Sequence, residues 1–110
     1  MCIRDRFGSN TKAGDTIVAC AQWDMTSGSA TLSTVGDAVN TYTIVSAASL
    51  TNTTHYSYLA TQCAYATRIV GGAANAVTFT WTSMVYGSLQ IWELTPGFFD
   101  SAAPPTILVA

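Results

Sequence analysis

The chain has 110 residues, of which 49% are hydrophobic and only 9% are charged, and its net charge is -2. This length suits a single domain, and so apolar a composition excludes a disordered chain, which would be rich in charge. The four basic residues are too few and too scattered to neutralise a run of phosphates, so nucleic acid is not an expected partner. No apolar run approaches the roughly 20 residues of a membrane-spanning helix, so we expect no membrane insertion.

Residues 1–6, with the sequence MCIRDR, differ from the rest of the chain. They carry three of its ten charged residues and lack the threonine-rich alternation that follows. Their sequence resembles a leader seen on many translated environmental reads, where it looks like adapter sequence rather than protein. We therefore expect a non-native leader that takes no part in the fold, and a first strand missing from the chain.

The first expected strand covers residues 16–23, after a turn at residues 13–15. It begins apolar on both faces, which is typical of a central strand in a sheet. Because successive side chains of a strand point to opposite sides, one face collects the residues that we expect in the core. These are Ile17, Ala19, Ala21 and Trp23.

Two shorter strands are expected at residues 30–35 and 42–45. The connection between them, GDAVN at residues 36–40, contains the glycine, aspartate and asparagine that favour tight turns. The pattern predicts a hairpin, with an inner face made of Leu32, Tyr42 and Ile44.

Three strands are expected in the second half of the chain, at residues 56–70, 76–82 and 88–94. Strict alternation in the middle one places three large apolar groups on one face, which is the strongest strand signal in the sequence: Val77, Phe79 and Trp81. Turns at residues 71–75 and 83–87 predict that the three strands form an antiparallel meander, with Phe79 and Trp81 facing Trp23 across the core.

The flanking strands give weaker patterns. In residues 56–70 the predicted inward positions are Leu59, Cys63 and Tyr65. In residues 88–94, Leu89 and Ile91 point one way and Gln90 and Trp92 the other. Short strands separated by turn residues, with no helical period, predict an all-β antiparallel sandwich of about six to eight strands over residues 7–101. Residues 102–110 are expected to be a linker or the start of a following segment, because two adjacent prolines cannot join a ladder.

The three cysteines form neither a disulfide framework nor a zinc pattern. Cys20 and Cys63 leave two alternatives, an inter-sheet disulfide or two small buried thiols. The second is favoured, because free cysteine packs readily as a small hydrophobe.

Catalytic and metal-binding patterns are weak. His55 is the only histidine and no G-x-S-x-G elbow accompanies it, so we expect no enzyme. Asp15, Asp24, Asp37 and Asn40 lie in turns, but calcium takes six to eight oxygens from clustered ligands, and turn capping explains all four residues without a metal. No cofactor is expected.

Glu93 falls on the same strand face as Leu89 and Ile91, where a buried carboxylate needs partners. Either backbone N–H groups or Arg68 satisfy it, or it lies at the open end of the sandwich. We interpret Glu93 as structural, together with Trp23, Phe79 and Trp81.

Four further aromatic residues raise the possibility of a ligand site: Trp92, Tyr56, Tyr58 and Tyr86. Exposed aromatic rings on a sheet stack on sugar rings in many carbohydrate-binding modules. The alternative is that Trp92 packs beneath a loop and the tyrosines brace the ends of the sandwich, which we favour because large aromatic side chains are mostly buried.

Several short motifs resemble immunoglobulin-like repeats of secreted and surface proteins of environmental bacteria. In the front half these are AGDTIV at residues 13–18, Trp23-Asp24, VGD at residues 35–37 and NTYT at residues 40–43. In the back half they are Tyr65-Ala66, GGA at residues 71–73, VTF at residues 77–79 and IWEL at residues 91–94. The resemblance covers roughly residues 7–101.

The resemblance implies a β-sandwich module in a larger extracellular or cell-surface protein, with no catalytic residues. The expected function is structural, as a spacer or adhesion module whose partners are the neighbouring domains of the chain. The alternative is a carbohydrate-binding module, with glycans or surface proteins as partners.

Overall fold

A computed structural model describes residues 1–24, 30–45, 48–52, 56–72, 75–83 and 85–95, with the side chains of 48–52 and 56–58 left aside. Every regular element in these ranges is a strand. No helix among the described residues is long and apolar enough to cross a membrane. The strands are β1 (Cys2–Arg6), β2 (Thr16–Asp24), β3 (Leu32–Gly36), β4 (Thr43–Ile44), β5 (Ala48–Asn52), β6 (Tyr56–Ala66), β7 (Ala76–Trp81) and β8 (Tyr86–Leu94).

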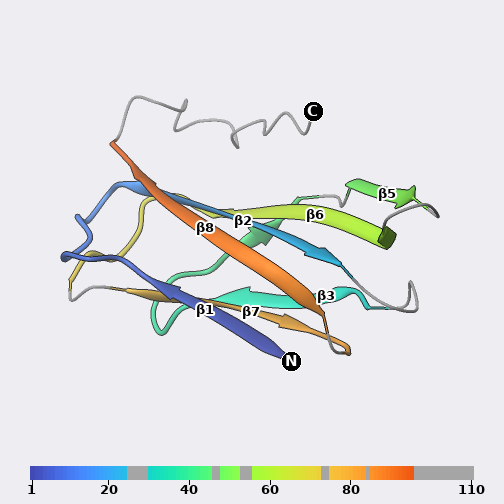
Figure 1. The fold of residues 1–110 in the computed structure, drawn as a ribbon. Coiled ribbons are helices and arrows are strands. Elements are labelled where there is room, and N and C mark those ends of the chain that lie inside the picture. The colour runs from blue at the N-terminus through green and yellow to red at the C-terminus, as the bar shows by residue number, and fades with distance from the viewer. Residues whose placement is uncertain (25–29, 46–47, 53–55, 73–74, 84, 96–110) are drawn as a thin grey trace.

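The strands form two antiparallel sheets that face each other. One sheet has the order β1-β7-β3, and the other has the order β4-β6-β2-β8, with β5 also paired to β6. Figure 1 shows them as two layers, with β2, β6 and β8 in one and β1, β7 and β3 in the other. The predicted all-β antiparallel fold is confirmed, and its two layers have the form of a β-sandwich.

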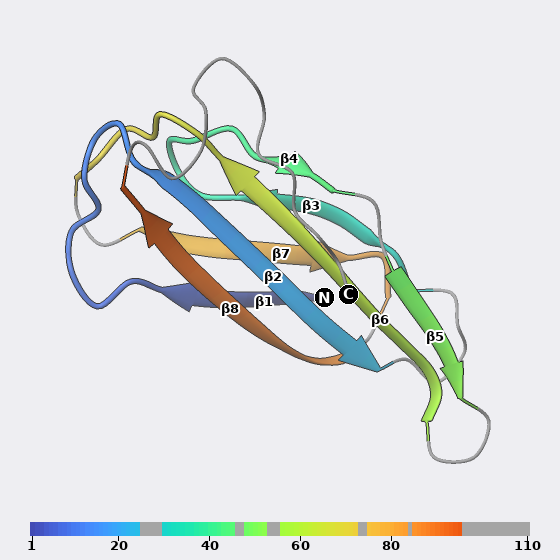
Figure 2. The same ribbon diagram turned by 90° about the horizontal axis from the view of Figure 1, so that it is seen from above.

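The predicted meander of the last three strands is wrong. β7 lies between β1 and β3 in the three-stranded sheet, whereas β6 and β8 flank β2 in the other sheet. Figure 2, seen from above, shows β7 crossing beneath the larger sheet. Alternation indicates that a strand has one buried face, but not whether that face is covered by its chain neighbours or by the opposite layer.

The predicted hairpin is wrong for the same reason. β3 pairs with β7, and β4 pairs with β6 in the other sheet, so the connection between β3 and β4 crosses from one layer to the other. The turn residues between β3 and β4 therefore lead the chain from one sheet to the other and do not close a hairpin.

The core lies between β2 and β7. The inner face of β2 is the predicted one, and its four residues are buried: Ile17, Ala19, Ala21 and Trp23. Phe79 and Val77 are fully buried opposite it. The rings of Trp23 and Trp81 meet edge to face with centroids 5.5 Å apart, a geometry that contributes about 0.5–1.5 kcal/mol beyond the buried area.

The faces of β6 are reversed relative to the prediction. The inner positions carry the alanines Ala60, Ala64 and Ala66, all buried. The outer positions carry Leu59, Cys63 and Tyr65. The register with β2 requires this arrangement, because Cys63 lies opposite Cys20, which points away from the core. Alanine gives only a weak hydrophobic signal, so the sequence favoured the larger residues.

Residues 1–6 differ from the expectation that they lie outside the fold. Cys2–Arg6 forms β1 and pairs with β7, from Cys2 opposite Thr80 to Arg6 opposite Ala76. Ile3 packs against the core, whereas Arg4 and Arg6 are exposed. This alternation lets the segment occupy the edge of the three-stranded sheet.

Candidate functional site

The outer face of the five-stranded sheet is the side of β8, β2 and β6 that points away from the core. Its residues lie in four rows across the three strands, in the order β8, β2, β6. The rows are Trp92–Val18–Tyr65, Gln90–Cys20–Cys63, Ser88–Gln22–Thr61 and Tyr86–Asp24–Leu59.

Two exposed aromatic rings stand at opposite ends of this face. The side chain of Trp92 is 44% exposed and that of Tyr86 is 73% exposed. They lie six residues apart on the same side of β8, which corresponds to about 20 Å along an antiparallel strand. Of the four predicted ligand-binding aromatics, these two share one face, whereas the side chains of Tyr56 and Tyr58 lie outside the described residues.

Tyr65 is an aromatic residue that the sequence analysis placed in the core. In the structure it belongs to the row of Trp92 on the outer face, with Val18 between them, and it is partly exposed. The row therefore carries an aromatic group on each of two strands.

The middle of the face is polar and uncharged. A depression of about 70 Å³ is lined by Cys20, Gln22, Thr61, Ser88 and Gln90. Thr61 donates its hydroxyl proton to the carbonyl of Ala21 at 3.1 Å. The side chains of Gln22, Ser88 and Gln90 are exposed and make no hydrogen bond within the described part of the chain. Sequence reasoning gave none of these three residues a role, although it placed Gln90 on the same side of its strand as Trp92.

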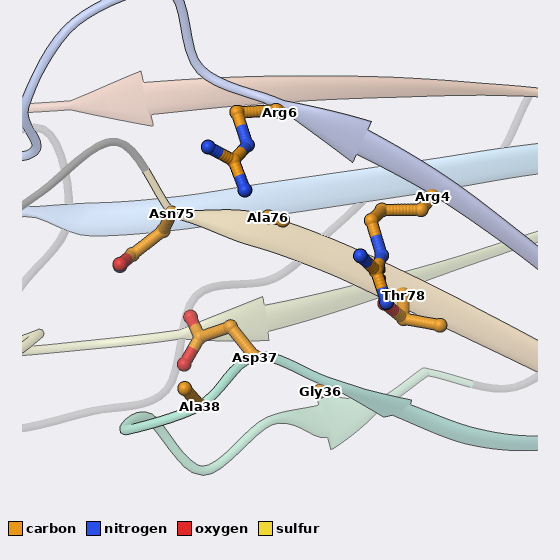
Figure 3. A pocket seen from close by; sticks show the side chains of 8 residues that line it. All are labelled: Arg4, Arg6, Gly36, Asp37, Ala38, Asn75, Ala76 and Thr78. Atoms are coloured by element: carbon orange, nitrogen blue, oxygen red, sulfur yellow. Dashed lines mark hydrogen bonds between the residues drawn. The ribbon is translucent and has the colours of Figure 1, made fainter.

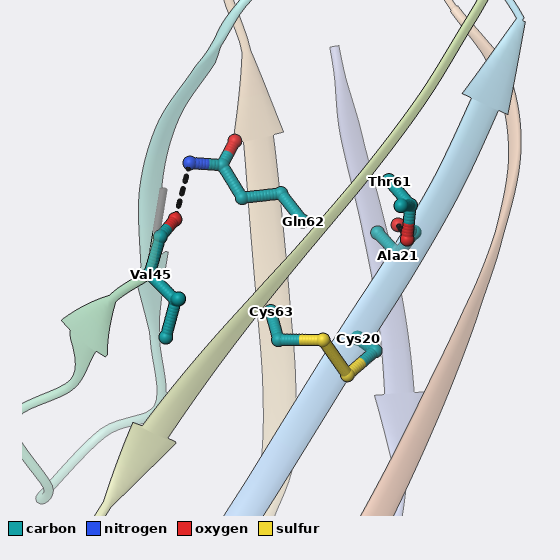
Figure 4. The surroundings of a disulfide bond; sticks show 6 residues. All are labelled: Cys20, Ala21, Val45, Thr61, Gln62 and Cys63. Carbon is teal, nitrogen blue, oxygen red and sulfur yellow. Dashed lines mark hydrogen bonds between the residues drawn. A yellow bond between two sulfur atoms is a disulfide. The ribbon is translucent and has the colours of Figure 1, made fainter. Parts of the chain in front are cut away.

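A disulfide joins Cys20, which lines the depression, to Cys63 and so links β2 to β6 (Figure 4). The favoured prediction of two free thiols is therefore wrong, and so is an inter-sheet bond. The two residues are direct partners in the register of one sheet, with Cα atoms 4.0 Å apart. Beyond it, the amide of Gln62 donates to the carbonyl of Val45 at 2.8 Å.

Asp37 organises the crossing between the two sheets. Its carboxylate accepts hydrogen bonds from the backbone N–H groups of Val39 and Asn40, at 2.8 and 2.7 Å, and from the side chains of Asn40 and Tyr42, both at 2.9 Å. Asn40 in turn accepts a bond from the N–H of Val70 at 2.7 Å. Burial raises the pKa of Asp37, but the hydrogen bonds together outweigh it, so the pKa lies below its ordinary value. Burial and the contact with Asp37 raise the pKa of Tyr42.

The four residues weighed as calcium ligands do not form one group. Asp37 and Asn40 are hydrogen-bonded to each other, Asp15 is buried with its backbone carbonyl bonded to the N–H of Ile69, and Asp24 ends β2. Within the ranges that the structure describes, no three His, Cys, Asp or Glu side chains are grouped as a metal site would need. His55 lies outside the described residues.

Glu93 is partly exposed near the end of β8, opposite Ile17. Its Oε1 accepts a hydrogen bond from the backbone N–H of Lys12 at 2.6 Å. A backbone donor was one of the partners that the sequence allowed, and the contact ties the loop before β2 to the last strand.

A larger hollow of about 540 Å³ opens beside the three-stranded sheet (Figure 3). Arg4 and Arg6 project from β1 along one side of it, and Asp37 lies on the other. Arg4 also donates to the hydroxyl of Thr78 at 3.3 Å. Because both arginines belong to the segment interpreted as a leader, we assign this hollow no function.

Comparison of the chain with protein-family models, with curated proteins and with solved structures gives no match. The outer face of the five-stranded sheet is therefore interpreted from its own chemistry.

Proposed function

We propose that this chain is a non-catalytic module of a larger extracellular bacterial protein, acting as a spacer or in adhesion. The observation that carries the proposal is the outer face of the five-stranded sheet, where exposed aromatic rings flank an uncharged polar surface. Such a surface suits contact with a partner, because the rings offer apolar area and the groups between them offer hydrogen bonds.

The Cys20–Cys63 disulfide supports the extracellular part of the proposal. Disulfides persist in oxidising compartments and are rare in the reducing cytosol. The non-catalytic part is supported by Asp37 and Glu93. Both carboxylates accept hydrogen bonds from backbone N–H groups and so stabilise loops of the fold.

The immunoglobulin-like kinship belongs to the same proposal, and two facing antiparallel sheets support it. The proposed kinship concerns the two-sheet architecture and not the order of the strands. In an immunoglobulin sandwich the last two strands share a sheet and the disulfide joins the two sheets. Here β7 and β8 belong to different sheets. In chain order the paired strands β2 and β6 both lie between the paired strands β1 and β7, but the two pairs belong to different sheets, as in a jelly roll.

Carbohydrate binding is the second candidate function. It is favoured by the position of Trp92 and Tyr86 on one strand face, because an aromatic ring offers flat apolar area to the C–H face of a sugar. The amides and hydroxyls between them would bind sugar hydroxyl groups.

Affinity electrophoresis through gels that contain cellulose-derived, xylan, mannan or β-glucan polymers tests the second candidate. We expect at least one neutral polymer to retard the protein, and the Trp92→Ala variant to migrate as in a gel without polymer. If no polymer retards the protein or changes its tryptophan fluorescence, carbohydrate binding is excluded and the spacer or adhesion role stands alone.

A further inference from the structure

The spacing of the two exposed rings sets the size of a ligand that would use both. Trp92 and Tyr86 are separated by about 20 Å along β8, far more than one sugar ring spans. A ligand that stacks on both must therefore be a chain of sugars. Since β8 is the outermost strand of the sheet, such a chain would lie along its length, over the rows that it shares with β2.

The residues between the rings match the hydroxyl groups of a sugar chain. Gln90 and Gln22 each offer two amide protons and one carbonyl oxygen, and Ser88 offers a hydroxyl group. Sugar hydroxyls both donate and accept, so they can use all of these groups. The three side chains are exposed and have no hydrogen bond within the described structure, so each is available to a ligand there.

The charge on this surface argues against an acidic ligand. The three rows that contain Trp92, Gln90 and Ser88 hold no ionisable acid or base other than the tyrosine in the first of them. The row of Tyr86 holds one formal charge, that of Asp24, and it is negative. In these four rows a uronate or sulfated polymer would meet a carboxylate and no cation, and the repulsion would weaken its binding. A neutral polymer would meet no such repulsion.

The disulfide gives the surface a fixed shape. The bond between Cys20 and Cys63 holds β2 and β6 together beside the polar depression. It therefore fixes the distance between these two strands in the neighbouring rows. A preformed surface saves the ordering cost that binding would otherwise carry.

We infer that the ligand is a neutral, extended oligosaccharide that lies along β8, with one sugar stacked on Trp92, another on Tyr86, and those between them bonded to Gln90, Gln22 and Ser88. This inference rests on the proposed carbohydrate-binding function, since it specifies the ligand of the same surface.

Isothermal titration with cellohexaose, xylohexaose and mannohexaose tests it. At least one hexasaccharide is expected to bind, and its trisaccharide is expected to bind about tenfold more weakly or worse, because it cannot reach both rings. Trp92→Ala and Tyr86→Ala should each weaken the hexasaccharide about tenfold or more, as for central aromatic contacts elsewhere. Val70→Ala, at an exposed position away from this face, is the matched control and should bind as the wild type does.

Three results would overturn the inference. If Trp92→Ala weakens hexasaccharide binding but Tyr86→Ala does not, the protein binds carbohydrate, but the ligand does not stack on both rings. Tighter binding of the galacturonate hexamer would remove the neutral ligand. No binding of any sugar, with capture of a protein partner that Trp92→Ala abolishes, would remove the carbohydrate function itself. Circular dichroism of each variant verifies that its fold is intact.

Discussion

The inner and outer faces of the five-stranded sheet come from the same three strands but use different side chains. The inner face of β2 and β6 consists mostly of alanines beside Trp23, so the larger rings of β7 can fill the space between the layers. The outer face carries amides, hydroxyls, a disulfide and exposed aromatic rings. Close packing between the layers limits the choice of residue on the inner face, whereas the outer face is under no such limit.

Phe79→Ala should give the largest effect on stability. The ring is fully buried against the inner face, so its loss should lower the free energy of unfolding by about 3–5 kcal/mol. Tyr86→Ala on the outer face is the control and should change it by no more than about 0.5 kcal/mol. Urea denaturation of both variants measures the difference. Equal losses would break the contrast between the two faces.

Removal of the Cys20–Cys63 disulfide should have the next largest effect. The bond closes a loop with a sequence separation of 43 residues, and its loss should cost about 2–4 kcal/mol. The double variant Cys20→Ser, Cys63→Ser can be compared with Cys2→Ser, which changes the free exposed cysteine of β1. If the double variant melts at the temperature of the wild type, the disulfide contributes no stability to the fold.

Asp37→Asn tests the crossing that joins the two sheets. Loss of the charged acceptor should lower the free energy of unfolding by about 1–3 kcal/mol at neutral pH. Because the pKa of Asp37 is lowered in the folded state, its contribution is present above the ordinary pKa and is lost as the pH falls through the folded pKa. The gap between variant and wild type should therefore narrow below about pH 4. A gap that stays constant between neutral and acid pH would show that the charge of Asp37 is not involved.

Glu93→Gln should give the smallest of these effects. It weakens the hydrogen bond from the N–H of Lys12 without changing the shape of the side chain, at a cost of about 0.5–1.5 kcal/mol. Asp24→Asn, at the other end of the same sheet, should cost less. Thermal unfolding compares the two variants, and identical melting temperatures would contradict a structural role for Glu93.

The sequence predicted local features better than pairings. Alternation gave the correct buried face of Ala76–Trp81 and correctly separated Leu89 and Ile91 from Trp92, because the direction of a side chain follows from the backbone of its own strand. It failed for Tyr56–Ala66, where alanines line the core and Tyr65 points outward. The candidate site was found only in part. Trp92 and Tyr86 were singled out for their aromatic character, whereas Gln22 and Gln90 carry no signal until the register places them between the two rings.

By itself the sequence determined that the chain forms antiparallel strands, which of their faces are most apolar, and that Trp23, Phe79 and Trp81 belong together. These properties depend on the period of the side chains and on the transfer of apolar area from water. Only the tertiary structure decided which strands are neighbours, and so that Cys20 meets Cys63 and that β7 lies in the other layer from β6 and β8. Strand partners are chosen by how two layers cover each other's apolar faces, a property of the whole chain that no single segment contains.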